Sequence, residues 1–430
     1  MPAHRTAAVI SIGDELVLGQ TLDTNTRWLA SRLTDLGVRV VEHATVEDDA
    51  QRLAALFARL SAETDLLLTT GGLGPTADDL TRTALAAFLN ERLVTDEASL
   101  AQIRAWFEGR GRTMPETNSV QALRPESARS LANPNGTAPG LLATDPRGVL
   151  IACMPGPPHE MRPMFEASVL PEIRPPEDRT IVTRVLHTFG YGESEVASRL
   201  GELMARTASP TVGTTASTGV VSVRIRHESE GTSEDAESAV ERMAETVRDK
   251  LGVAIFAEGS RTLEEMVVRV LWERRDTLAV VESCTGGMLG QMLTMVPGAS
   301  DAFVGGWITY SNEQKTQMVG VSKETLEAHG AVSRQCCHEM AAGGLERSDA
   351  DHCLAVTGVA GPGGGTDEKP VGMVWIGLAS RGMKPDIRCF RFKGPRDIIR
   401  LWSTRTAMAM LRLRMINTTM KLLGEDHEAR

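Results

Sequence analysis

Glu282-Ser283-Cys284-Thr285-Gly286-Gly287 joins a predicted buried strand to a predicted helix. The apolar residues 277–281 precede this stretch, and residues 288–295 follow it with helical spacing. A serine at such a turn lies beside unpaired N–H groups at the positive end of the helix dipole. Negative charge on a reacting carbonyl group or a phosphate is stabilised there. A plain helix cap explains the same residues.

The composition is that of a globular protein with two or three domains. The chain has 430 residues, of which 42% are hydrophobic, 24% charged and only 4% aromatic. Its net charge of −10, without a long run of Lys or Arg, argues against nucleic acid or an anionic membrane as the main partner. We see no transmembrane-length apolar run and no signal-peptide core, and the six cysteines form no Cys-x-x-Cys pair. We therefore expect a cytoplasmic protein with free thiols.

The N-terminal third alternates strand and helix patterns. Strands are predicted at residues 7–13, 38–44 and 65–70, and helices at 23–36 and 48–60. This alternation predicts parallel βαβ units with helices on both faces of an open sheet, where ligands bind beyond the carboxyl ends of the strands. Three loops should therefore share one edge, at residues 13–15, 71–79 and 154–161.

The loop at residues 71–79 is the most informative of the three. Gly71, Gly72 and Gly74 allow the backbone to approach a ligand closely, and its N–H groups can hold a phosphate. Asp78 and Asp79 then open the next helix, and paired carboxylates beside a phosphate suit a hard cation such as Mg²⁺. Acidic residues that complement the helix dipole are the structural alternative. Further candidates around this site are Thr76, Asp14, Glu15, Asn25, Gly136 and Thr137.

The middle of the chain has a different order of strand and helix patterns. Residues 171–176 resemble a linker, and the following strand and helix patterns predict a small α+β module without a catalytic cluster. The segment Gly190-Tyr191-Gly192 lacks the G-x-x-G spacing of a nucleic-acid clamp. We therefore expect a structural or dimerising module.

Ser283 needs a base if it is a nucleophile. His329, His338 and His352 lie at a helix end, within a helix and before a strand, so none is well placed. A neutral Lys in a desolvated site is the alternative, and Lys315 fits better because it follows Tyr310 at the same predicted sheet edge.

A second glycine-rich loop, residues 358–366, should lie at this edge too. Its N–H groups can receive an anion, and so many glycines favour ligand contact over a plain surface turn. Nearby arginines can reach a phosphate as forks, although arginines on an exposed helix start are equally consistent. The candidates are Gly358, Gly361, Gly363, Arg396 and Arg400.

Several motifs together resemble the competence/damage-inducible protein CinA family over nearly the whole chain. The N-terminal ones are Gly13-Asp14-Glu15-Leu16, Asp23-Thr24-Asn25, residues 71–79, Asn135-Gly136-Thr137-Ala138-Pro139-Gly140, Pro155-Gly156, Pro158 and Glu160-Met161. The C-terminal ones are Glu282 to Gly287, Tyr310-Ser311-Asn312 with Lys315, His329-Gly330-Ala331-Val332-Ser333, Val356-Thr357-Gly358 and Ala360-Gly361-Pro362. Met154 and Pro157 stand where the family usually has Leu and Val.

The resemblance implies an α/β protein with three domains. Residues 1–172 resemble the MoaB/MogA molybdopterin-binding fold, residues 173–258 a KH-type α+β module, and residues 259–425 a three-layer α/β nicotinamide-nucleotide amidase. The amidase would convert nicotinamide mononucleotide to nicotinate mononucleotide and ammonia without a cofactor. The N-terminal domain would be an ADP-ribose pyrophosphatase that uses Mg²⁺, Mn²⁺ or Co²⁺ and yields AMP and ribose 5-phosphate. The resemblance also implies a homodimer.

The resemblance assigns roles in the amidase domain residue by residue. Ser283 is the nucleophile, Lys315 its base and Tyr310 an assisting hydroxyl. Thr285, Gly286 and Gly287 lie where we expect the oxyanion, Thr357 and Ser300 in the pocket, and Arg396 or Arg400 at the phosphate. Two other classes of function stay open: the N-terminal domain as a non-catalytic pterin- or nucleotide-binding module, and the whole chain as a DNA-processing accessory protein.

Overall fold

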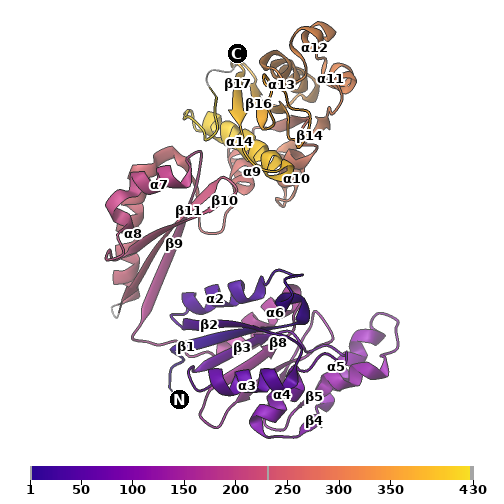
Figure 1. Cartoon of the computed structure of the whole chain (residues 1–430), viewed down its shortest axis with the longest axis vertical. Helices are drawn as coiled ribbons and strands as arrows, with labels where there is room; N and C mark the ends of the chain where they lie inside the picture. The colour runs from indigo at the N-terminus through magenta and orange to yellow at the C-terminus, as the bar shows by residue number, and fades with distance from the viewer. Residues whose placement is uncertain (1, 230–231, 427–430) are drawn as a thin grey trace. The chain divides into compact units, whose positions relative to one another are not determined.

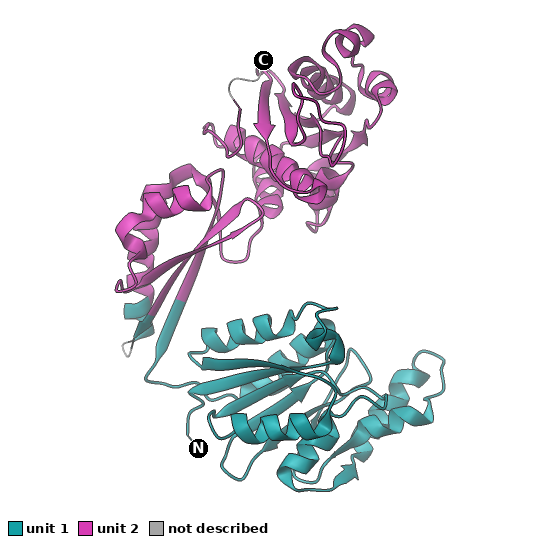
Figure 2. Cartoon of the chain, in the orientation of Figure 1, with its two compact units in different colours: residues 1–182, 228–236 teal, residues 183–227, 237–430 magenta. Residues whose placement is uncertain are grey.

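The computed structural model describes residues 2–229 and 232–426, and its chain folds into two compact units. Met1–Val182 and Glu228–Ala236 form unit 1, and Thr183–His227 and Glu237–Arg430 form unit 2 (Figure 2). No helix within the described part of the chain is long and apolar enough to cross a membrane.

A six-stranded sheet lies at the centre of unit 1. Its order is β2-β1-β3-β8-β7-β6, and the bounds are β1 Thr6–Ile12, β2 Arg39–Val46, β3 Leu66–Thr70, β8 Leu150–Met154, β7 Gly140–Thr144 and β6 Arg129–Leu131. The first four strands in this order are parallel, as the βαβ pattern predicts, whereas β7 and β6 are each antiparallel to their neighbour. The antiparallel edge is possible because β6, β7 and β8 follow one another through short connections.

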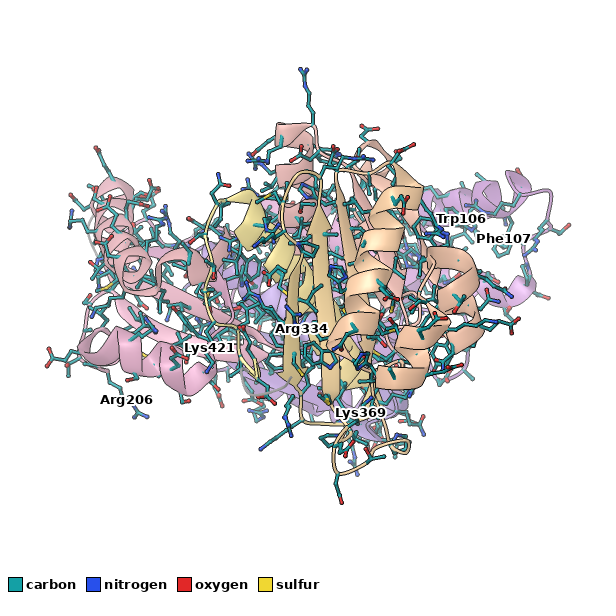
Figure 3. All side chains as sticks on the ribbon, turned by 90° about the horizontal axis from the view of Figure 1, so that it is seen from above. Trp106, Phe107, Arg206, Arg334, Lys369 and Lys421 are labelled. Atoms are coloured by element: carbon teal, nitrogen blue, oxygen red, sulfur yellow. The ribbon has the colours of Figure 1, made fainter. Side chains whose placement is uncertain are left out.

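Helices cover both faces of this sheet (Figure 1). Helices α3 (Ala50–Leu60) and α4 (Thr81–Leu89) bury Phe57 and Leu85 on one face. Helices α2 (Asn25–Asp35) and α6 (Pro158–Met164) bury Leu33 and Met161 on the other. The remaining elements are α1 Asp14–Val17, β4 Leu93–Thr95, β5 Leu123–Pro125 and α5 Glu97–Glu108, whose end carries Trp106 and Phe107 (Figure 3).

The middle module belongs to unit 2 for most of its length. Its sheet has the order β10-β11-β9-β12, and its elements are β9 Thr180–Phe189, α7 Glu193–Leu200, β10 Thr211–Ser217, β11 Val220–Ser229, α8 Ser233–Leu251 and β12 Ile255–Glu258. Phe189 and Phe256 join the same hydrophobic core as the C-terminal helices, and the rings of Phe189 and Trp402 lie 6.2 Å apart. The module therefore shares a core with the C-terminal domain.

The C-terminal domain is a three-layer α/β structure. Its sheet has the order β14-β13-β15-β16-β17, with bounds β13 Leu278–Glu282, β14 Phe303–Ile308, β15 His352–Gly358, β16 Met373–Ser380 and β17 Asp386–Arg391. The first three strands in this order are parallel, and the last two are antiparallel. One face packs against α9 Leu263–Arg274, α10 Met288–Thr294 and α14 Arg396–Met415, and the other against α11 Asn312–Val319, α12 Lys323–His329 and α13 Arg334–Ser348.

Candidate active sites

Ser283 lies in the turn between β13 and α10. Its N–H donates to the carbonyl of Val356 on β15 (2.9 Å), which fixes the turn against the neighbouring strand. Gly286 and Gly287 have φ angles of +57° and +92°, so the chain reverses sharply in a conformation that favours glycine. The serine side chain is almost buried, at 8% exposure.

Lys315 lies beside this serine, on α11. Its Nζ is 3.0 Å from Oγ of Ser283 and 2.8 Å from the carbonyl oxygen of Thr309. The residue is 1% exposed, and burial lowers the pKa of its amino group. Among the residues that the structure describes, no carboxylate forms an ion pair with it. The arrangement favours a neutral amine, which can accept the proton of the serine hydroxyl.

The N–H groups at the start of α10 are only partly free. Those of Gly287, Leu289 and Gly290 donate to the carboxylate of Glu282, and that of Gly286 donates to the carbonyl of Ser283. Of the three positions at which we expected the oxyanion, only Thr285 keeps its N–H without an internal acceptor in the described structure. Cys284, which we had not considered, also keeps one, so any oxyanion site here moves towards Cys284 and Thr285.

Two arginines from α14 approach the turn. Arg396 donates to the carbonyl of Gly361 (2.8 Å) and to the hydroxyl of Tyr310 (2.7 Å), whose side chain is exposed. Arg400 places two donors on the carbonyl of Thr285, at 3.1 and 2.6 Å. Arg396 is thus exposed at the edge of the site, whereas Arg400 holds the turn.

The other residues predicted for this site differ in how close they lie to Ser283. Thr357 and Gly358 end β15 beside the turn, and the Thr357 hydroxyl donates to the carbonyl of Ala331 (2.8 Å). Gly363 lies in the exposed loop that follows. Ser300 precedes β14, which is parallel to β13, so it lies at the opposite end of the sheet from Ser283 and is not brought to this site.

His352 is also at the far end of the sheet. It begins β15, and its ring contacts Ser380 at 2.8 Å and Asp276 at 3.4 Å. Burial lowers the pKa of its imidazole. This histidine therefore has a structural environment and does not reach Ser283.

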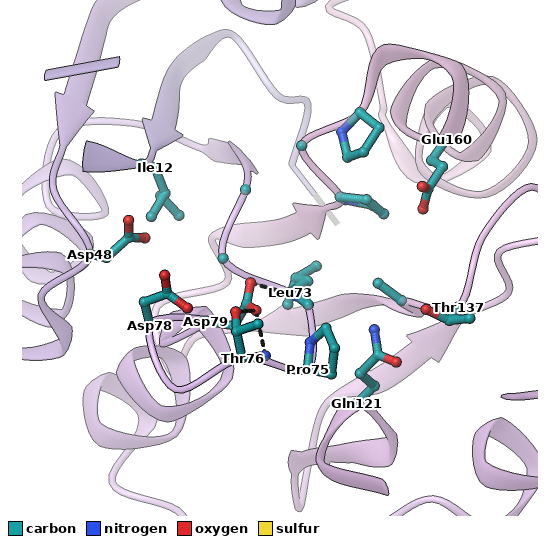
Figure 4. Close-up of a pocket in the computed structure, with 18 of the residues that line it drawn as sticks. Ile12, Asp48, Leu73, Pro75, Thr76, Asp78, Asp79, Gln121, Thr137 and Glu160 are labelled. Carbon is teal, nitrogen blue, oxygen red and sulfur yellow. Dashed lines mark hydrogen bonds between the residues drawn. The ribbon is translucent and has the colours of Figure 1, made fainter. Parts of the chain in front are cut away.

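Unit 1 contains a second candidate site, a cavity of about 350 Å³ at the carboxyl ends of the parallel strands (Figure 4). The three loops predicted to share an edge all line it. The predicted residues in its wall are Glu15, Gly71, Gly72, Gly74, Thr76, Asp78, Asp79 and Thr137. Asp48 and Gln121 also line it and were not predicted, and Glu160 lines it from the third of the predicted loops.

The glycine loop of this cavity is tightly packed. A Cβ atom at Gly71 would overlap the carbonyl oxygen of Ile12, and one at Gly72 would overlap the hydroxyl of Thr81. Asp79 accepts N–H groups from Gly74 (2.6 Å) and Thr76 (2.8 Å), so its carboxylate is used within the loop.

Arg82 supports the same loop from beneath and was not predicted. It is 4% exposed and donates to the carbonyls of Leu73 and Gly74, and burial lowers the pKa of its guanidinium to about 10. A buried arginine within a helix leaves no local sequence signal, because only the fold places the loop above it.

Carboxylates surround the cavity. Asp48 and Asp78 lie on one side and Glu160 on the other (Figure 4). Burial, followed by the nearby charges of Asp14, Asp78 and Glu15, raises the pKa of Asp48. No three His, Cys, Asp or Glu side chains within the described ranges are grouped so that they alone could hold an ion. This donor set fits a Mg²⁺-type ion that is bound by one or two carboxylates and by the oxygens of a substrate phosphate.

Three predicted residues shape the cavity indirectly. Asn25 donates to the Thr70 hydroxyl (3.0 Å) and to the carbonyl of Gly156 (2.6 Å), so it ties α2 to two of the strand-end loops. Gly136 lies against the Glu160 carboxylate. The N–H of Asp14 donates to Asp48 (3.0 Å), but Asp14 does not line the cavity.

The fold and these sites define a multidomain α/β protein with a MoaB/MogA-like domain and, in the C-terminal domain, a buried lysine in contact with a serine. Three family descriptions match the chain: "Probable molybdopterin binding domain" over residues 8–175, "Damage-inducible protein CinA KH domain" over 183–257 and "CinA C-terminal domain" over 260–415.

Relatives cover almost the full length. A protein from Caldicellulosiruptor bescii, named for competence-damage induction, is 42% identical over 411 residues, which are 96% of this chain and 99% of the relative. A "CinA-like protein" of Dictyoglomus thermophilum is 41% identical over 409 residues, 95% and 99% of the two chains. The crystal structure of the competence/damage inducible protein CihA from Agrobacterium tumefaciens is 40% identical, covering 35% of this chain and 95% of that one, with a TM-score of 0.34. The chain belongs to the CinA family.

Proposed function

We propose that unit 2 is an amidase that hydrolyses the carboxamide of nicotinamide mononucleotide by a Ser–Lys mechanism. The observation that carries the proposal is the 3.0 Å contact between Nζ of a buried lysine and Oγ of Ser283. The substrate comes from the resemblance to nicotinamide-nucleotide amidases.

The mechanism begins with the neutral amine of Lys315. One of its N–H groups donates to the carbonyl of Thr309, which directs the lone pair towards Ser283. The amine takes the hydroxyl proton as Oγ attacks the carboxamide carbon, and the oxyanion is received by the N–H groups of Cys284 and Thr285. Lys315 then gives the proton to the leaving nitrogen, and ammonia departs. Water attacks the acyl-enzyme, Lys315 accepts its proton, and Ser283 is restored as the nicotinate product leaves.

The substrate phosphate is assigned to Arg396. This side chain is exposed at the edge of the site, and its planar guanidinium has five N–H donors, of which two are used internally. Arg400 instead donates twice to the carbonyl of Thr285 and holds the turn.

The test is ammonia release from nicotinamide mononucleotide by purified protein. Ser283→Ala should reduce kcat by about 10³-fold or more, because no nucleophile remains. Ser260→Ala, an exposed serine in the turn before α9, is the matched control and should keep wild-type activity. Near-wild-type turnover in Ser283→Ala excludes the mechanism.

We further propose that unit 1 is a divalent-metal-dependent ADP-ribose pyrophosphatase. The carboxylate-lined cavity with its glycine loop supports this second activity. A bound divalent ion would neutralise charge on the pyrophosphate and polarise its phosphorus centres. The chain's own part is to present Asp48, Asp78 and Glu160 to the ion and the N–H groups of Gly72 and Leu73 to the phosphate, since those of Gly71 and Gly74 are bonded within the protein.

Substitutions of Asp78 and Asp79 can distinguish a role in ligand binding from a role in loop structure. Asp78→Asn should reduce ADP-ribose turnover and raise the metal concentration needed, without lowering the melting temperature, because Asp78 is exposed. Asp79→Asn should lower both activity and stability, by about 1–2 kcal/mol, because it weakens the bonds to Gly74 and Thr76. Calorimetry with ADP-ribose and with molybdopterin complements this test, since binding without turnover would make the unit a binding module.

A further inference from the structure

Glu282 is a buried carboxylate that the proposed mechanism does not use. It is the last residue of β13, in the interior of the C-terminal sheet, and it is 1% exposed. Its carboxylate accepts N–H groups from Gly287 (2.9 Å), Leu289 (3.0 Å) and Gly290 (2.8 Å). The side chain therefore links the end of β13 to the start of α10, across the turn that contains Ser283.

A buried carboxylate needs a specific compensation, because removing a charge from water is costly. Within residues 2–229 and 232–426, no Lys, Arg or His forms an ion pair with Glu282. The compensation comes from the three N–H donors and from the positive end of the helix. The anion-binding capacity of this helix start is therefore filled by the protein's own side chain.

The main chain of Glu282 reaches the other catalytic group. Its carbonyl accepts the N–H of Thr309 (2.8 Å), and the carbonyl of Thr309 accepts Nζ of Lys315 (2.8 Å). The residue thus lies next to Ser283 in the chain and is two hydrogen bonds away from Lys315.

We propose that Glu282 is the positioning residue of the nucleophile turn. Its carboxylate fixes residues 287–290, so that the turn presents Ser283 to Lys315 and leaves the N–H groups of Cys284 and Thr285 free. This inference rests on the proposed amidase function. It adds that the substrate phosphate is not bound at the α10 start, because Glu282 occupies that place.

The experiment compares two variants with a control in the full-length protein. Glu282→Gln keeps the shape but presents an amide NH₂ to one of the three N–H donors, so at least one hydrogen bond is lost. Glu282→Asp keeps the charge on a shorter side chain. Glu346→Gln removes an exposed carboxylate on α13 and serves as the matched control.

Both variants should lose kcat for ammonia release by about 10–100-fold, with KM changed by less than about threefold, because a small misplacement of a nucleophile affects the chemical step. The pH of half-maximal kcat should stay at the wild-type value, since Lys315 keeps its surroundings. Unchanged kcat in folded Glu282→Gln, or a rise in KM alone, overturns the inference.

A second measurement is independent of the substrate. Phenylmethylsulfonyl fluoride reacts covalently with activated serines, and mass spectrometry of the intact chain gives the rate at Ser283. This rate should fall with kcat in both variants, and equal rates in Glu282→Asp and wild type contradict the inference even if Glu282→Gln does not fold. If wild-type protein is labelled at Ser283 but releases no ammonia from nicotinamide mononucleotide, the proposed substrate is wrong, while the labelling rates still test Glu282.

Discussion

At the scale of single residues, the proposed amidase site depends on keeping one lysine buried without a carboxylate partner among the described residues. Lys315 is 1% exposed, and its Nζ contacts a hydroxyl and a carbonyl, neither of which is charged. Burial lowers the pKa of this amine below its ordinary value of 10.5. The burial that lowers this pKa, and so favours the neutral amine that the proposed mechanism needs, therefore costs stability.

The burial of Lys315 should make the free energy of unfolding depend on pH. Above pH 10.5 lysine is neutral in both folded and unfolded chains; as the pH falls towards the lowered pKa, only the unfolded chain gains a proton. Lys315→Met should therefore abolish amidase activity yet stabilise unit 2 at pH 7, by roughly 1–4 kcal/mol, as apolar replacements of buried ionic groups often do. The gain should shrink as the pH is raised to 10.5. Urea unfolding at several pH values measures it.

Lys323→Met is the matched control for this substitution. Lys323 is exposed at the start of α12, so its replacement should change the free energy of unfolding by less than about 0.5 kcal/mol and leave ammonia release intact. A destabilised Lys315→Met variant would mean that the buried amine is charged and held by its polar neighbours.

Residue types and their order singled out Ser283 and Lys315 as candidates, and the family resemblance assigned their roles. The sequence indicated both because each follows a predicted strand at one sheet edge. Asp48 gave no such signal, because it reaches the N-terminal cavity from a segment remote in sequence from the glycine loop. Arg82 gave none either, because it lies within the helix that follows this loop and contacts the loop only in the fold. The sequence placed Ser300 in the pocket only by resemblance, and the parallel pairing of β13 with β14 puts it at the other end of the sheet.

At the scale of elements, periodicity predicted most helices and strands to within two or three residues. Helix α2 occupies residues 25–35 and α3 residues 50–60, inside the predicted ranges 23–36 and 48–60, because apolar spacing marks both helices. The antiparallel placement of β7, β16 and β17 was not predictable from spacing alone, since a strand pattern does not carry its pairing direction.

Two helical glycines differ in whether packing requires them, although glycine has a low helix propensity at both positions. A Cβ at Gly343 of α13 would overlap the carbonyl oxygen of Val319, which ends α11, the helix that carries Lys315. At Gly290 of α10 the nearest atoms would be 3.6 Å away, which is ordinary contact. Gly343→Ala should destabilise the protein by about 1–3 kcal/mol and reduce amidase activity, whereas Gly290→Ala should stabilise it by about 0.5–1 kcal/mol. Thermal unfolding of the two variants gives opposite signs; a stabilised Gly343→Ala would show that α11 can move away freely.

At the scale of the whole molecule, the two candidate sites belong to units with separate cores. The clusters on the two faces of the unit 1 sheet use residues between Ala7 and Ile173 only. Those of unit 2 use residues between Phe189 and Leu422, so the middle module and the C-terminal domain are stabilised together. Three family matches thus form two compact units, because Phe189 and Phe256 of the middle module belong to the same hydrophobic cluster as the C-terminal helices.

Separate cores should give separate unfolding transitions. Replacing Trp28 and Trp106 with Phe leaves tryptophans in unit 2 alone, at positions 272, 307, 375 and 402. In this variant, urea-induced changes of fluorescence should follow one transition, while far-UV circular dichroism follows two. ADP-ribose with Mg²⁺ should shift only the transition that fluorescence does not detect, by about 2.7 kcal/mol at a ligand concentration of 100 Kd, and nicotinate mononucleotide should shift only the other. Coincident transitions in both signals, or a shift of both by either ligand, would show that the two units are energetically coupled despite their separate cores.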